Sequence, residues 1–271
     1  MDLTPPEGSL RSHSGGDPEK HRPLERRAAS RTAVVWEAVQ QVLAATRGPA
    51  GSDSGDGGGD GSATVVDIGG GTGGFAVRLA ELGHRVTVVD PSPDALAALG
   101  RRAAESNVAD LVTGEQGDLA NLLDLVGEHS ADLVLCHGVL GLLDDPAAAL
   151  VTIGRVLRPG GVLSLLVGQR HAAVLARAMA GHFRAARAAL DTTDGPGEHR
   201  FTAPEVTDLL AASGFTSQTV QAVRVFADLV PGSLLDLEPG ASAALLDLER
   251  AVADRPEYLT LAAQLHVLAS H

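Results

Sequence analysis

The sequence of 271 residues is poor in cysteine, in aromatic side chains and in long apolar runs. Its one cysteine, Cys136, excludes an internal disulfide framework. No stretch approaches the roughly 18 apolar residues of a membrane span, and no apolar core follows Met1 as it would in a secretory signal. Only 3% of the residues are aromatic although 44% are hydrophobic, so leucine, valine and alanine must fill the core. We therefore expect a cytoplasmic protein.

Positive charge is also scarce, because the formal net charge is −13 at pH 7. Broad electrostatic capture of nucleic acid needs basic surface that displaces counterions, and this balance argues against it. A local basic patch is still compatible with the composition.

Composition divides the chain into several parts. Residues 1–29 mix Pro, Gly, Ser, His and charges with few apolar residues, which predicts a disordered tail. Apolar residues at helical spacing predict a helix over roughly Arg31–Ala45, inside a lid-like segment of residues 30–50. Residues 51–62 contain only Gly, Ser and Asp, which predicts a flexible linker; without the closing glutamate of an EF-hand we expect no metal site there. The main domain is expected over residues 63–271, with an insertion at about 169–203.

The most informative stretch runs from Val65 to Gly74, an apolar run that ends in an acid and breaks into glycines. Glycine is required where the backbone takes a positive φ or comes very close to a ligand. The next residues, Phe75 to Leu82, have helical apolar spacing with Gly83 as the stop. Strand, glycine loop and helix N-terminus together predict a site for the polar part of a nucleotide-like ligand.

Two acids indicate which ligand this loop favours, because the glycines alone also fit the GxGxxG of dinucleotide-binding folds. Asp67, at the strand end, would repel a pyrophosphate but attract the sulfonium and ammonium groups of S-adenosylmethionine. It therefore disfavours a nicotinamide oxidoreductase. Asp90, which ends another apolar run, can accept hydrogen bonds from two ribose hydroxyls. The alternative is a tight structural turn followed by a solvated aspartate. The set Asp67, Gly69, Gly71 and Gly73 resembles the first motif of class I S-adenosylmethionine methyltransferases.

Strand and helix patterns alternate through the rest of the domain, which favours a parallel sheet with helices on both faces. Strands are expected at Leu111–Thr113, Asp132–His137 and Val162–Val167, and an antiparallel pair at Val220–Phe226 and Leu261–Leu268. Helices are expected after Ser92-Pro93 and Asp145-Pro146, over His171–Leu190, after the capping box Thr202-x-x-Glu205, and over Ala241–Ala253. The class I resemblance implies a Rossmann-like, mostly parallel seven-stranded sheet with an antiparallel C-terminal strand.

Further motifs follow along the chain; they are, in order, Asp132–Pro146, Val156–Ser164, Met179–Phe183, Val223–Asp228, Leu246–Arg250, Pro256–Leu261 and His266-Val267. This ordered set resembles the tRNA 5-carboxymethoxyuridine methyltransferase family. The resemblance implies methyl transfer from S-adenosylmethionine to the carboxylate of a modified wobble uridine in tRNA, forming a methyl ester. The family's cofactor contacts correspond to Arg31, Gly69, Gly70, Gly71, Asp90, Gln116, Gly117 and His137.

These positions are chemically reasonable. Arg31 can form a bidentate pair with the methionyl carboxylate, although a solvated helix-end arginine is the alternative. His137 follows a buried strand and can contact the cofactor; the alternative is a core or surface histidine. A carboxylate acceptor is ionised near pH 7 and needs no general base. A cation to hold it is expected instead, and Arg224 or Arg170 are the candidates.

The insertion departs from the family. Asp191–Glu198 replaces a run of lysines that a related protein carries there, and this weakens the expectation of tRNA as partner. Arginines before it can supply a basic patch or form a solvated face. A small-molecule O-methyltransferase on the same fold therefore stays open, as does a non-enzymatic binder of the cofactor.

Overall fold

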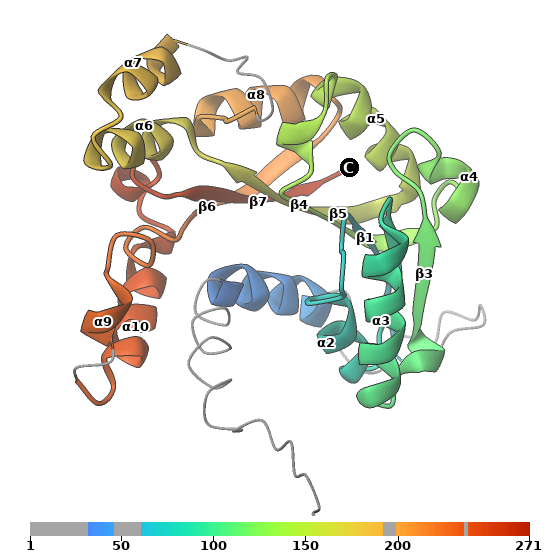
Figure 1. Cartoon of the computed structure of the whole chain (residues 1–271). Coiled ribbons are helices and arrows are strands. Elements are labelled where there is room, and N and C mark those ends of the chain that lie inside the picture. Colours follow the sequence, from blue (N-terminus) through green and yellow to red (C-terminus); the bar gives the residue numbers. More distant parts are fainter. Residues whose placement is uncertain (1–31, 46–60, 192–198, 236–237) are drawn as a thin grey trace, which may run out of the picture.

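The computed structural model describes residues 32–45, 61–191, 199–235 and 238–271 (Figure 1). The predicted tail, Arg31, nearly all of the predicted linker and residues 192–198 of the predicted insertion lie outside the described residues. These expectations stay predictions.

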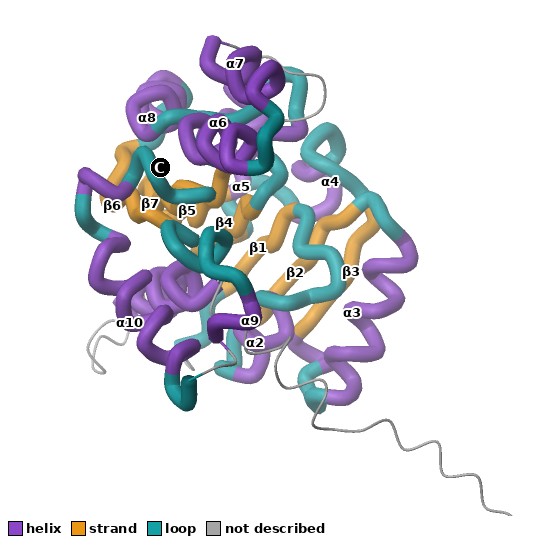
Figure 2. Tube along the Cα trace, turned by 60° about the vertical axis from the view of Figure 1, so that its left-hand side comes forward, coloured by secondary structure: helices purple, strands orange, loops and turns teal. Residues whose placement is uncertain are grey.

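A seven-stranded sheet forms the centre of the described chain, in the order β3-β2-β1-β4-β5-β7-β6 (Figure 2). All neighbours from β3 to β5 pair in parallel, whereas β7 is antiparallel to both β5 and β6. The predicted fold class and the antiparallel C-terminal strand are therefore confirmed. The strands are β1 (Thr64–Ile68), β2 (Arg85–Asp90), β3 (Val112–Gln116), β4 (Ala131–His137), β5 (Leu157–Gly168), β6 (Thr216–Val223) and β7 (Gln264–Ser270).

Helices cover both faces of the sheet because each central strand is apolar on both sides. One face of the sheet, with Val66, Ile68 and Cys136, packs in a hydrophobic cluster that α4, α5 and α8 cover. The opposite face, with Val65 and Leu135, packs in a second cluster that the helix of residues 32–45, α2 and α3 cover (Figure 1). The helices are residues 32–45, α2 (Ala76–Glu81), α3 (Pro93–Glu105), α4 (Leu122–Val126), α5 (Pro146–Val156), α6 (Arg170–Met179), α7 (Phe183–Asp191), α8 (Ala203–Ala212), α9 (Gly232–Leu235) and α10 (Ala241–Ala253).

Three predicted helix starts are confirmed with their caps. The Ser92 side chain accepts a hydrogen bond from the Ala95 amide at 3.3 Å, and Asp145 accepts one from Ala148 at 2.9 Å. Thr202 and Glu205 form the complete capping box that begins α8. These side chains satisfy amides that have no partner within the helix, so sequence alone locates the helix starts.

The prediction of one continuous helix over His171–Leu190 is wrong. It is two helices, α6 and α7, which are separated at Gly181. Gly181 has φ +78°, and its amide and that of His182 bond back to the carbonyls of Ala178 and Arg177. This hydrogen-bonded ending requires the left-handed backbone that glycine adopts readily.

The predicted edge strands also end at other residues. β6 ends at Val223 instead of Phe226, because Arg224 takes the left-handed φ of +61°. β7 begins at Gln264, after a turn that leaves Leu261 half-exposed. β3 extends to Gln116, beyond the predicted Thr113. None of the described helices is long and apolar enough to cross a membrane.

Candidate functional site

The glycine loop follows β1 at the carboxyl edge of the sheet and leaves no room for side chains at Gly69, Gly70 and Gly73. Gly69, Gly71 and Gly73 have φ values of +69°, +54° and +78°. An added Cβ at Gly70 would lie 2.4 Å from Asp67 Oδ2, and one at Gly73 would lie 2.2 Å from Leu99 Cδ1. The loop is therefore a fixed backbone surface at the end of β1, as its sequence predicts.

Asp67 lies beneath this loop and is 4% exposed. Burial, together with the negative charge of Asp90, raises the pKa of Asp67 from 3.8 to about 7. No donor among the described residues opposes these two effects. A bound cation would favour the ionised form, so this position suits a positively charged ligand group.

Asp90 ends β2 next to the glycine loop. Its Oδ2 accepts the Gly71 amide and its Oδ1 the Ser92 amide, both at 2.9 Å. Each oxygen keeps a second lone pair for a ligand hydroxyl. Gln116 pairs with Asp90 in the sheet register, and the Gly117 amide donates to the Asp90 carbonyl at 3.2 Å. The structure thus gathers the predicted residues from the ends of β1, β2 and β3.

His137 ends β4 and begins a chain of polar contacts across the sheet. Its Nε2 lies 2.9 Å from Ser164 Oγ, which lies 2.8 Å from Nε2 of buried His266. Nδ1 of His266 lies 3.2 Å from Gln221 Oε1, and Gln221 Nε2 donates to Asp254 at 2.9 Å. Burial lowers the pKa of His137 to about 4 and, with the charge of His137, that of His266 to about 3. Both rings are therefore neutral at pH 7.

The helix of residues 32–45 packs next to these groups through aromatic side chains. Trp36 contacts Phe75 at 5.8 Å between ring centroids, and Phe75 meets the His137 ring edge-on at 5.0 Å. The Arg78 guanidinium lies over the Trp36 ring at 3.7 Å. This packing brings the predicted lid helix beside the residue that follows the glycine loop.

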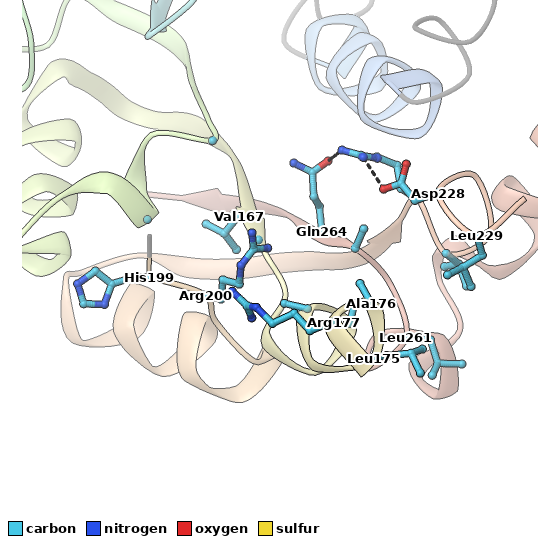
Figure 3. A pocket seen from close by; sticks show the side chains of 18 residues that line it. Val167, Leu175, Ala176, Arg177, His199, Arg200, Asp228, Leu229, Leu261 and Gln264 are labelled. Carbon is cyan, nitrogen blue, oxygen red and sulfur yellow. Dashed lines mark hydrogen bonds and ion pairs between the residues drawn. The ribbon is translucent and has the colours of Figure 1, made fainter. Parts of the chain in front are cut away.

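A cavity of about 440 Å³ opens at the same edge of the sheet (Figure 3). One part of its wall is apolar and includes Leu175, Leu229 and Leu261. The polar part consists of Arg177 of α6, His199 and Arg200 before α8, Arg224 and Asp228 after β6, and Gln264 at the start of β7. Three arginines in the lining give the cavity the means to hold an anion beside an apolar group.

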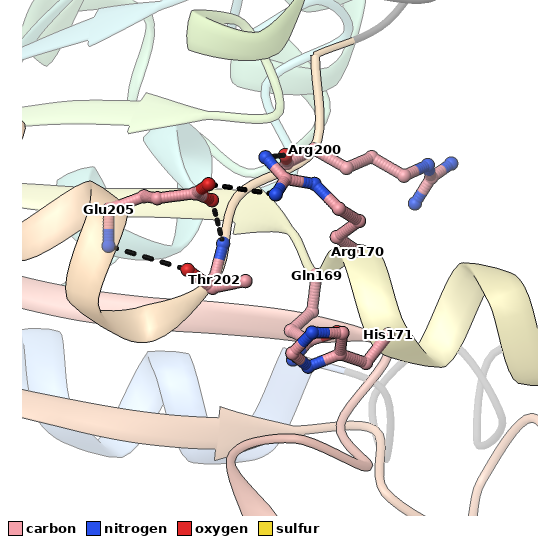
Figure 4. A network of polar contacts seen from close by, with 6 residues as sticks. All are labelled: Gln169, Arg170, His171, Arg200, Thr202 and Glu205. Atoms are coloured by element: carbon pink, nitrogen blue, oxygen red, sulfur yellow. Dashed lines mark hydrogen bonds and ion pairs between the residues drawn. The ribbon is translucent and has the colours of Figure 1, made fainter. Parts of the chain in front are cut away.

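Of the two predicted acceptor arginines, Arg224 lines this cavity. Its guanidinium pairs with Asp228 and donates to Gln264 Oε1 at 3.2 Å. Arg170 instead bonds Glu205 at 2.7 Å and the Arg200 carbonyl at 3.1 Å, beside the capping box of α8 (Figure 4). These contacts account for Arg170 without a ligand, and its acceptor role stays a prediction.

Sequence comparison assigns the chain to a family. Residues 66–163 match the family model described as a methyltransferase domain. The tRNA 5-carboxymethoxyuridine methyltransferase of Escherichia coli strain K12 is 31% identical over 246 residues, which cover 88% of this chain and 87% of that protein. The chain belongs to this family of S-adenosylmethionine-dependent methyltransferases.

Two further comparisons relate the methyltransferase to other methyltransferases, one by sequence and one by fold. A ubiquinone biosynthesis O-methyltransferase of Xanthomonas oryzae pv. oryzae is 33% identical over 123 residues, covering 44% of this chain and 48% of that protein. The crystal structure of an S-adenosylmethionine-dependent methyltransferase from Mesorhizobium loti superposes with a TM-score of 0.50 and 22% identity, covering 78% of this chain and 91% of that one. The superposition shows that the methyltransferase has the class I fold. Its cofactor, S-adenosylmethionine, follows from the family membership.

Sequence reasoning missed part of the cavity of this methyltransferase. In the sequence, Arg177 is one of several arginines before residue 191 with nothing to distinguish it, and no motif indicates Arg200 or Gln264. Arg200 stands two residues before the capping box and Gln264 begins β7, and these positions gave a weak signal that both lie near the carboxyl edge. No group of three metal-ligating side chains occurs among the residues that the structure describes.

Proposed function

We propose that this methyltransferase transfers a methyl group from S-adenosylmethionine to the carboxylate of 5-carboxymethoxyuridine in tRNA, forming a methyl ester. The observation that carries the proposal is the arginine-lined cavity at the carboxyl edge of the sheet. It occurs in a chain with similarity to a tRNA 5-carboxymethoxyuridine methyltransferase over 88% of its length. A ligand with a carboxylate and a flat, partly apolar ring matches both parts of the cavity wall.

The residues at the ends of β1, β2 and β3 fit the cofactor. Asp67 would hold a cationic group, Asp90 the ribose hydroxyls, and the backbone of Gly69, Gly70 and Gly71 would pack against the ligand. Gln116, Gly117 and His137 would complete this site, and Arg31, outside the described residues, would bind the methionyl carboxylate. When bound, S-adenosylmethionine supplies a methyl group on a sulfonium, which departs as a neutral thioether.

The chain mainly aligns and desolvates the reacting groups. Arg224, with Arg200 or Arg177, would hold the acceptor carboxylate, which attacks as it is and releases no proton. The apolar part of the wall, with Leu175, Leu229 and Leu261, would exclude water from the ester that forms. This division of roles agrees with a site in which His137 is neutral at pH 7.

The positive charge of residues 169–190 also supports tRNA as the partner. Residues 169–190 contain four arginines and no aspartate or glutamate, although the whole chain has a net charge of −13. Arg184 and Arg187 are exposed on α7, next to exposed Phe183. Arginine and an exposed ring are the side chains that contact phosphates and unstacked bases. Because α6 also lines the cavity, the arginine-rich pair of helices α6 and α7 would contact nucleotides that flank the modified one.

A small-molecule O-methyltransferase is the second candidate. It is favoured by the acidic balance of the chain and by the partial similarity to a ubiquinone biosynthesis O-methyltransferase. On this alternative the cavity would take a free carboxylate or hydroxyl compound. A location in the cytoplasm stays a prediction for both candidates.

The deciding experiment is methyl transfer from labelled S-adenosylmethionine to total tRNA from a strain that lacks this gene, followed by nucleoside mass analysis. tRNA without the carboxymethoxy group is the control substrate. A base-labile methyl ester on the wobble uridine, absent from the control, is the expected result. No label in tRNA, with S-adenosylhomocysteine binding intact, would refute the tRNA acceptor and favour the small-molecule candidate.

A further inference from the structure

The chain after β6 converges on one buried carboxylate. Glu249 of α10 is 2% exposed, and its Oε2 accepts the Val225 amide at 2.9 Å. Its Oε1 accepts the amides of Phe226 and Ala227 at 2.8 and 2.7 Å. Three successive backbone donors therefore point at a single side chain that lies 22 to 24 residues away in sequence.

This convergence depends on the unusual backbone of Arg224. With φ +61°, Arg224 ends β6 and turns the chain, and its carbonyl still accepts the Ala263 amide at 3.2 Å. A left-handed backbone is unfavourable for a residue with a side chain, so neighbouring contacts must maintain it. The bonds to Glu249 begin at the next residue and act together with the Arg224–Ala263 backbone bond to maintain it.

The same segment forms one wall of the arginine-lined cavity. Arg224, Val225 and Asp228 all line it, and the Arg224 guanidinium is bracketed there by Asp228 and Gln264. Glu249 itself does not line the cavity. The Glu249 carboxylate thus holds the backbone of a segment whose Arg224 side chain lines the cavity.

We propose that Glu249 is a positioning residue, which fixes the segment 224–227 so that Arg224 presents its guanidinium to the acceptor. This inference rests on the proposed function, because it takes the cavity as the acceptor site. In a purely structural role, Glu249 would only fasten α10 to the sheet, as Val252 does by packing with Val225.

The experiment compares Glu249→Gln with Val252→Ala, a change on the same helix that removes packing and keeps the carboxylate. The amide of glutamine retains one acceptor oxygen and turns a donor toward the backbone amides. Each variant is measured for its melting temperature, its affinity for S-adenosylhomocysteine, and its kcat and KM with modified tRNA. Hydrogen exchange of residues 224–228 is recorded in both variants. A double-mutant cycle pairs Glu249→Gln with Arg224→Ala.

We expect Glu249→Gln to lower kcat/KM for the acceptor about tenfold, chiefly through KM, with cofactor affinity within about twofold of the wild type. In the Arg224→Ala background the same change should have an effect below about twofold, because it acts through Arg224. Exchange should rise in residues 224–228 of Glu249→Gln only. Val252→Ala should lower the melting temperature and leave kcat/KM within about twofold.

The proposal is overturned if Val252→Ala reduces kcat/KM as much as Glu249→Gln at an equal loss of melting temperature. It is also overturned if the full effect persists without the Arg224 side chain, or if exchange of residues 224–228 is unchanged. An inactive wild type on tRNA would refute the proposed acceptor instead. The exchange comparison would then still decide whether Glu249 holds this segment, since it requires no acceptor.

Discussion

Replacing Asp67 with asparagine is expected to stabilise the cofactor-free methyltransferase at neutral pH while weakening its affinity for the cofactor. Burial and the charge of Asp90 raise the pKa of Asp67 to about 7 in the folded chain, against 3.8 ordinarily. Above about pH 7 the folded protein must therefore keep an unfavourable negative charge on buried Asp67. Asparagine has nearly the same shape and removes that charge, but it cannot balance a cationic ligand.

The sign of the pH dependence follows from the raised pKa. Below about pH 4 the carboxyl is protonated in both the folded and the unfolded chain, and it makes no difference to stability. Between pH 4 and 7 the unfolded chain releases the proton and the folded chain retains it, so stability falls by about 1.4 kcal/mol per pH unit. Asp67→Asn should therefore gain up to about 4 kcal/mol relative to the wild type by pH 7, and no more above it.

Urea unfolding of both proteins between pH 4 and 9, without cofactor, measures this difference directly. Asp94→Asn, which removes an exposed carboxylate from the first turn of α3, is the matched control and should change stability by less than about 0.5 kcal/mol. Calorimetric titration with S-adenosylhomocysteine measures the affinity. An Asp67→Asn protein that is less stable than the wild type at pH 8, or a difference that does not grow between pH 4 and 7, would refute the reasoning.

Three further changes test other parts of the site. Gly70→Ala places a Cβ 2.4 Å from Asp67 Oδ2 and should weaken S-adenosylhomocysteine binding by about tenfold or more. Calorimetric titration measures this, and unchanged binding would contradict a closely packed loop. Arg224→Ala should lower kcat/KM for the acceptor, chiefly through KM, with cofactor affinity unchanged; an equal loss of cofactor affinity would remove Arg224 from the acceptor site. Gly181→Ala, at φ +78° between α6 and α7, should lower the free energy of unfolding by about 1 kcal/mol with kcat/KM retained; thermal unfolding and steady-state kinetics check this, and a stabilised protein would be inconsistent with the left-handed position.

The sequence was sufficient for features that are local along the chain. The glycine loop, the caps at Ser92 and Asp145 and the capping box at Thr202 depend on residues within a few positions of one another. Buried strands such as β4 and β5 were also clear, because continuous apolar runs at this length are typical of parallel sheets. The carboxyl-edge location of Asp67 and Asp90 followed from the βα alternation, whereas Gln116 was a candidate only through the family resemblance.

Features that depend on contacts between distant segments could not be predicted in the same way. The early end of β6 at Arg224 is maintained by Glu249, whose position on α10 gives no local sign of that contact. Arg170 and Arg224 are equivalent as sequence candidates. Each pairs with a carboxylate in the structure, and what distinguishes them is that Arg224 lines the cavity. The break at Gly181 was missed because the apolar spacing continues through it, so periodicity outweighed the glycine in the prediction.

The contacts that begin at His137 also have a direction. Gln221 donates its amide to Asp254, so its oxygen faces His266 and must receive the Nδ1 proton of that ring. The neutral His266 ring then accepts the Ser164 proton at Nε2, and Ser164, with only one proton to give, must accept from His137. Nδ1 of His137 is thereby left as an acceptor. An exposed carboxylate at the end of α10 thus selects the tautomer of a ring at the carboxyl edge of β4, four hydrogen bonds away.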